Sequence, residues 1–100
     1  MRKIDLTNYD YEGQTFHVAP SLVAILFSPP KLDAREVLRL DELARRIETT
    51  EDPTVLLEEV DYARIVKGLN ATDLQPHGRS VVEFIRRILD APNVSVEEKH

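Results

Sequence analysis

The sequence predicts an α+β fold, built as a single domain over residues 1–100. Near the amino terminus, residues 3–6 and 15–18 alternate apolar and polar side chains, as half-buried strands do. Between residues 33 and 90, apolar side chains recur at three- and four-residue spacing, which is typical of amphipathic helices. A chain of this length can bury one core and is too short for two domains. We therefore expect a small antiparallel sheet packed on about four short helices.

The first two predicted strands form a β-hairpin. Residues 7–14 separate them and are rich in Asn, Asp and Gly, which favour turns. The side chains expected to face inward are Ile4, Leu6, Phe16 and Val18. Near the carboxyl terminus, Val94 and Val96 alternate with polar residues, and this pattern predicts a final strand beside the hairpin.

The apolar run at residues 22–27 fits either a buried strand or a buried helix, because a run this short has no diagnostic period. Pro20 and Ser21 favour the helix, since proline fits the first turn of a helix. Pro29 and Pro30 then end it.

Asp33 is a suitable N-cap for the next helix, and Glu36 three residues later completes a capping box. The apolar positions of this helix are Ala34, Val37, Leu40, Leu43, Ala44 and Ile47. Two acid-first pairs at four-residue spacing add to its stability, Asp41 with Arg45 and Glu42 with Arg46.

The rest of the chain adds one short segment and two helices. Residues 55–57 form a short apolar run, which fits a strand or a tight crossing. Helices follow over residues 61–70 and 79–90. Tyr62 and Phe84 lie on their apolar faces, and we expect the Tyr62 hydroxyl to lie at the rim of the core.

The sequence shows no pattern of catalytic or metal-binding residues. It has no cysteine, which excludes disulfides and thiolate metal sites and fits a reducing compartment. The three histidines, His17, His77 and His100, are scattered, so we expect no metal and no other cofactor. Ser80 follows Gly78 as in a nucleophile elbow, but the second glycine of that motif is missing. We therefore expect a protein that is not an enzyme.

An acidic block is the most specific feature of the sequence. The net charge is −5, from 18 acidic and 13 basic residues, which opposes non-specific binding to nucleic acid. Six acids without an intervening Lys or Arg lie between residues 47 and 63: Glu48, Glu51, Asp52, Glu58, Glu59 and Asp61. Such a block is either a solvated connection between helices or a surface that attracts a basic protein partner. The second interpretation makes these six residues the predicted partner-binding site.

Nucleic-acid binding is the less favoured alternative. Helices over 61–70 and 79–90 joined by a turn could be mistaken for a helix-turn-helix, but a recognition helix needs basic residues near its start. Val81 and Val82 stand there instead. The arginines that could contact nucleic acid are Arg45, Arg46, Arg86 and Arg87.

Three stretches of the chain carry a family resemblance: KIDLTNY at 3–9, VLLEE at 55–59 with Asp61 and Tyr62 after it, and VEFIRRILDAP at 82–92 with VSVEEK at 94–99. They are similar to small uncharacterised proteins encoded by tailed phages and prophages. The resemblance implies a phage-derived protein acting in a bacterial cytoplasm, and it implies no catalytic residues.

We expect a protein that acts by binding another protein, as a self-associating assembly factor or an accessory factor. The apolar run at 22–27 exceeds what one small core is expected to bury, and the terminal β segments offer sheet edges. The alternative is an inhibitor of a host enzyme or defence system that uses the acidic surface. A cytoplasmic location is expected, because the sequence has no cysteine and shows no secretory signal. No membrane association is expected, because the longest apolar run is far shorter than the roughly 20 residues of a membrane span.

Overall fold

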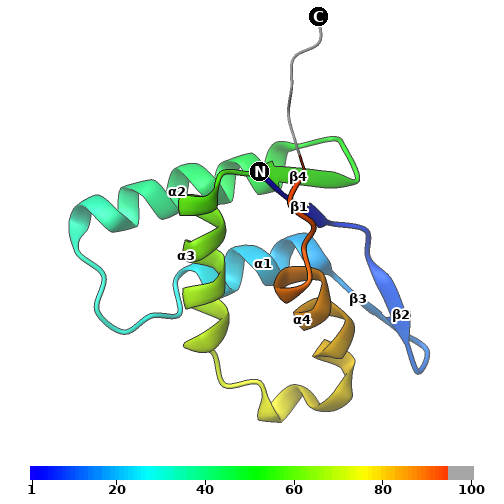
Figure 1. Cartoon of the computed structure of the whole chain (residues 1–100). Helices are drawn as coiled ribbons and strands as arrows, with labels where there is room; N and C mark the ends of the chain where they lie inside the picture. The colour runs from blue at the N-terminus through cyan, green and yellow to red at the C-terminus, as the bar shows by residue number, and fades with distance from the viewer. Residues whose placement is uncertain (95–100) are drawn as a thin grey trace, which may run out of the picture.

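A computed structural model describes residues 1–94 (Figure 1). Its elements are, in order, β1 (Arg2–Asp5), β2 (Tyr9–Tyr11), β3 (Gln14–Phe16), α1 (Val18–Leu26), α2 (Ala34–Thr49), β4 (Thr54–Leu57), α3 (Glu59–Asn70), the 3₁₀ helix η1 (Gln75–Val81) and α4 (Val82–Leu89). The predicted α+β class is confirmed.

The strands form two separate antiparallel pairs, which differs from the expected single sheet. β1 pairs with β4, and β2 pairs with β3. Glu12 and Gly13 both have positive φ, 51° and 84°, so they form a tight two-residue hairpin turn. This turn confines the hairpin to residues 9–16, and residues 2–5 are left to pair with β4 instead.

Three of the four side chains expected to face inward are buried, and they lie in different parts of the fold. Ile4, Leu6 and Val18 are buried, and Val18 begins α1 rather than ending a strand. Phe16 is half-buried and stacks on Tyr9, with 4.9 Å between the ring centroids.

Residues 22–26 are helical, as the flanking prolines indicated. Leu22, Ile25 and Leu26 are buried, whereas Phe27 is 41% exposed. The core therefore buries most of the apolar run at residues 22–27. Phe27 is the one large apolar side chain of this run that stays exposed.

Asp33 caps α2 as predicted, since its Oδ1 accepts a hydrogen bond from the Glu36 backbone N–H at 2.8 Å. The Glu36 carboxylate bonds to Arg64 on α3 rather than back to the cap. Four of the predicted apolar positions are buried: Leu40, Leu43, Ala44 and Ile47. Ala34 and Val37 are exposed, so the first turns of α2 contribute little to the core.

α4 begins at Val82, later than residue 79, because Gly78 with φ 62° interrupts the preceding turns. Phe84 and Ile88 of α4 are buried. The Tyr62 hydroxyl of α3 donates to the Ile88 carbonyl at 2.6 Å, which confirms its expected place at the rim of the core.

The end of the described chain lies along β1, on the side opposite β4. Lys3 N–H donates to the Pro92 carbonyl at 3.1 Å, and Val94 N–H donates to the Met1 carbonyl at 2.7 Å. The predicted final strand lies outside the described residues from position 95 onward.

Among residues 1–94, no helix combines the length and apolar character that crossing a membrane requires.

Candidate functional site

Four members of the predicted acidic block lie around β4 and are exposed. Glu48 lies in the last turn of α2, Glu51 and Asp52 lie in the connection that follows, and Glu58 is the N-cap of α3. Within residues 1–94, no Lys or Arg forms an ion pair with any of the four. We call these four residues the acidic corner.

The other two members of the block are neutralised by arginines. Asp61 pairs with Arg64 at 2.8 Å and with Arg46 at 3.5 Å, and only 22% of its side chain is exposed. Glu59 pairs with Arg2 of β1 at 3.0 Å. The block is uninterrupted along the sequence, but in space arginines from three elements divide it.

Arg64 joins α2 to α3. Its guanidinium bonds to Glu36 at 2.8 Å as well as to Asp61, and 18% of its side chain is exposed. The hydrogen bond that Arg64 donates to Glu36 and the charges of Glu36 and Asp61 outweigh burial and raise the pKa of Arg64. Asp61 is therefore held in a structural ion-pair network rather than presented to a partner.

Arg46 reaches from α2 to β4, where its Nη2 donates to the Leu56 carbonyl at 2.8 Å. A groove of about 330 Å³ lies beside this contact. It is lined by Arg46, Thr49, Thr50, Asp52, Thr54, Val55 and Leu56. The groove therefore follows β4, with a carboxylate of the acidic corner in its wall.

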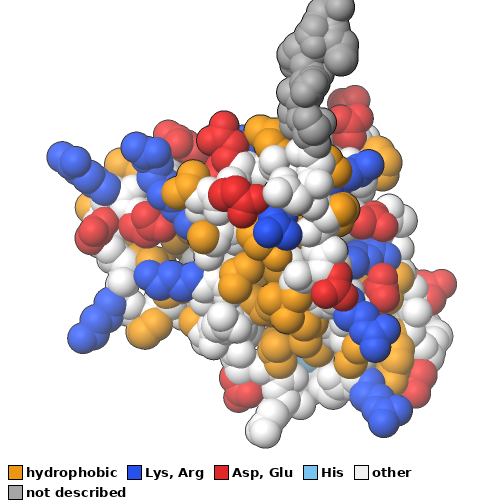
Figure 2. Space-filling model, viewed as in Figure 1, with side chains coloured by type: hydrophobic (Ala, Val, Ile, Leu, Met, Phe, Trp, Pro, Cys, Tyr) orange, Lys and Arg blue, Asp and Glu red, His pale blue; other side chains and the backbone are white. Residues whose placement is uncertain are grey.

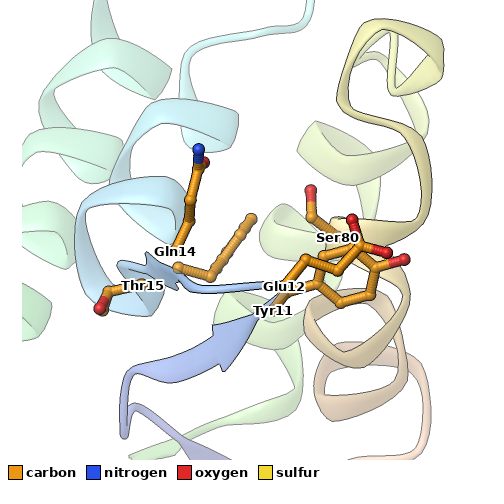
Figure 3. Close-up of a pocket in the computed structure, with 6 residues that line it drawn as sticks. Tyr11, Glu12, Gln14, Thr15 and Ser80 are labelled. Carbon is orange, nitrogen blue, oxygen red and sulfur yellow. The ribbon is translucent and has the colours of Figure 1, made fainter.

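A second pocket, of about 220 Å³, lies between the β2–β3 hairpin and η1 (Figure 3). Tyr11 and Glu12 of the hairpin lie beside Ser80, whereas Thr15 points away from it. The Ser80 hydroxyl donates to the His77 carbonyl at 2.8 Å. In the described part of the chain, no histidine ring or carboxylate is hydrogen-bonded to this hydroxyl, so Ser80 stabilises a turn of η1.

The arginines proposed for nucleic-acid binding do not converge. On α2, Arg45 forms the predicted pair with Asp41 at 2.9 Å, and this hydrogen bond raises the pKa of Arg45. Arg46 bonds to Asp61 and Leu56 rather than forming the expected pair with Glu42.

On α4, Arg87 pairs with Glu83, four residues earlier, at 3.0 Å, and only 14% of its side chain is exposed. Its guanidinium lies over the Tyr9 ring, 5.1 Å from the centroid. Arg86 is exposed, but α4 lies apart from α2 (Figure 1). The structure therefore does not bring the four arginines together into one basic surface.

Sequence reasoning missed the open edge of β4. It placed the sheet edges at the chain termini, whereas β1 is covered on both sides by β4 and residues 92–94. The apolar run at 55–57, already consistent with a strand, was the signal that could have located this edge.

Comparison of the chain with protein-family models, with curated proteins and with solved structures finds no match.

Proposed function

We propose that this protein acts without catalysis, by binding another protein through the acidic corner. The observation that supports this proposal is that four exposed carboxylates, three before β4 and one directly after it, have no ion-pair partner among residues 1–94. Arg2 and Arg46 are paired with other acids, Glu59 and Asp61. An acidic surface attracts a basic partner over a distance and raises the rate of association.

The resemblance to small tailed-phage proteins supports a bacterial cytoplasm as the setting. There the protein serves as an accessory or assembly factor that recruits a basic protein. The alternative is inhibition of a host enzyme or defence system whose own binding groove is basic. Both roles use the same acidic corner and differ in the identity of the partner.

The test is charge reversal, measured on a partner identified by crosslinking in bacterial extract. The variant Glu51→Lys, Asp52→Lys, Glu58→Lys should weaken binding mainly through slower association, with a loss that shrinks as salt rises. Glu59 and Asp61 are left unchanged because they hold arginines of the fold.

The matched control reverses three exposed acids elsewhere, Asp10→Lys, Asp73→Lys and Asp90→Lys, and so produces the same change in net charge. It should bind the partner nearly as the unmodified protein does. If the acidic-corner variant kept full affinity for the partner at low salt, the acidic corner would be only a solvated surface.

Self-association is a second candidate, favoured by exposed apolar side chains on neighbouring helices. Val60 of α3 is 57% exposed and Leu89 of α4 is 50% exposed. Figure 2 shows apolar side chains gathered over these two helices. If this surface joins two copies, light scattering should show a mass that rises with concentration, and Leu89→Gln should abolish the rise.

A further inference from the structure

We propose that β4 accepts an extended, Lys- or Arg-rich segment of a partner protein as an additional strand along its free edge. This inference rests on the proposed function and specifies how the acidic corner is used. In this mode of recognition, main-chain hydrogen bonds supply affinity and neighbouring side chains supply selectivity.

The pairing of β1 with β4 determines which backbone groups of β4 face outward. Leu6 N–H donates to the Pro53 carbonyl at 2.7 Å, so the odd-numbered residues 53, 55 and 57 bond toward β1. Thr54 and Leu56 alternate with them and therefore direct their N–H and C=O groups away from β1. The bond from Arg46 to the Leu56 carbonyl agrees with this orientation.

The edge formed by Thr54 and Leu56 is largely unpaired. Arg46 covers the Leu56 carbonyl, but no group within residues 1–94 bonds to the Thr54 carbonyl or to the N–H of either residue. β1 offers no such edge, because Lys3 N–H bonds to Pro92 on its other side. A strand edge with free donors and acceptors is a template for a further strand.

The surroundings of this edge determine the chemistry of the added strand. Asp52 lines the groove that runs beside β4, and Glu58 follows directly after the strand. Cationic side chains on the incoming strand would therefore lie near unpaired carboxylates. A second copy of this chain would bring the same acids and a net charge of −5 to the edge, and like charges across a strand pair are destabilising.

Arg46 protects the edge in the free protein. A charged side chain over a strand edge hinders indiscriminate pairing. An incoming strand can replace the Arg46 N–H at the Leu56 carbonyl with its own backbone N–H. Arg46 then keeps its ion pair with Asp61, at 3.5 Å in the free protein, so its charge is not left unpaired.

The probe is a fluorescein-labelled peptide of alternating Lys and Val, KVKVKVKV, titrated into the full chain at low salt. Amide NMR spectra should show shifts at Thr54 and Leu56 and slower hydrogen exchange of their N–H groups. The same peptide with N-methylated amides keeps its charge but cannot donate backbone hydrogen bonds. It should bind at least about tenfold more weakly by fluorescence anisotropy.

Two substitutions at one position separate backbone from side-chain effects. Leu56→Pro removes the outward N–H without removing a bond to β1, since proline is tolerated at such edge positions. It should weaken binding of the Lys-Val peptide by about tenfold or more, whereas Leu56→Thr keeps the N–H and should stay within about threefold. Slow exchange of the Val55 and Leu57 amides verifies that each variant is folded.

The outcomes separate this inference from the function on which it rests. If reversal of Glu51, Asp52 and Glu58 abolishes peptide binding while N-methylation leaves it intact, the acidic corner binds partners but strand addition is wrong. If neither change matters, or the peptide does not bind, the inference fails. If the amide shifts at Thr54 and Leu56 grew with protein concentration alone, the added strand would come from a second copy of this chain. That result would contradict the proposal that the added strand is a basic segment of a partner protein.

Discussion

Gly68 of α3 lies so close to Ile25 of α1 that a Cβ on the glycine would stand 2.1 Å from the Ile25 carbonyl oxygen. The same Cβ would stand 2.8 Å from the Ile25 carbonyl carbon. Both contacts are with backbone, which a rotamer change cannot relieve. The packing of α3 on α1 therefore depends on the absence of a side chain at position 68.

Gly68→Ala should consequently destabilise the protein, although alanine is the better helix former by about 1 kcal/mol. We expect a loss of about 1–3 kcal/mol in the free energy of unfolding, because the two helices must separate to admit the methyl group. Urea denaturation measures the change. Lys67→Ala, at the adjacent exposed position, should stay within about 0.5 kcal/mol. A more stable Gly68→Ala variant would show that the helices are not in backbone contact.

Phe84→Ala should cost about 3–5 kcal/mol in the free energy of unfolding, since removal of a buried ring leaves a cavity. Phe84 is 2% exposed, and its ring centroid lies 5.3 Å from that of Phe16. Arg86→Ala on the exposed side of α4 should cost no more than about 0.5 kcal/mol. Equal losses for the two variants would contradict the orientation of α4.

Glu12→Asn should stabilise the β2–β3 hairpin. Glu12 has φ 51°, and asparagine tolerates this left-handed conformation better than glutamate does. We expect a gain of up to about 1 kcal/mol, measured by thermal unfolding. Gly13→Ala is the opposite control: a Cβ there would meet nothing within 4 Å, so its expected cost of about 1 kcal/mol arises from φ 84° alone. An unchanged melting temperature in both variants would mean that this turn does not contribute to stability.

Asp5→Asn should change the stability of the protein in acid. Burial raises the pKa of Asp5, but the hydrogen bond from the Thr7 N–H at 2.9 Å and the charge of Arg87 outweigh burial and hold this pKa below its ordinary value. A carboxylate with a depressed pKa stabilises the folded state above the unfolded-state pKa of about 3.9. This contribution disappears as pH falls through the lower folded-state pKa.

The Asp5→Asn variant should therefore be less stable than the unmodified protein at pH 7, with a difference that narrows below about pH 4. Urea unfolding at a series of pH values measures this difference. A constant difference across the acid range would show that ionisation of Asp5 is not linked to folding.

The helices were predictable because their signals are local. Asp33 caps α2 through a residue three positions away, and apolar spacing alone identified Leu40 and Ile47 as core. Strand pairing was not predictable in the same way. The partner of β1 lies about fifty residues along the chain at β4, and an alternating pattern identifies a strand without identifying its neighbour.

The candidate site was likewise predictable where its signals are local and not where it depends on long-range contacts. The acids around β4 were evident from sequence, but their partition into free and paired groups depends on tertiary contacts. Arg2 and Arg46 approach Glu59 and Asp61 only after β1 and α2 have packed beside α3, whereas Arg64 pairs with Asp61 three residues away on the same helix. The open edge of β4 likewise depends on tertiary pairing, because within residues 1–94 β4 has β1 as a strand partner on one side only.

The position of β1 between β4 and residues 92–94 also determines the order of events during synthesis. Arg2–Asp5 are synthesised before both of the segments that flank them: β4 follows about fifty residues later, and residues 92–94 follow later still. Contacts this distant in sequence form late, because closing a long loop is entropically costly. The helices can form locally while the polypeptide is still growing. The sheet edge of β1 that residues 92–94 cover therefore remains open until Val94 has been synthesised, and nascent copies on the same messenger can mispair there.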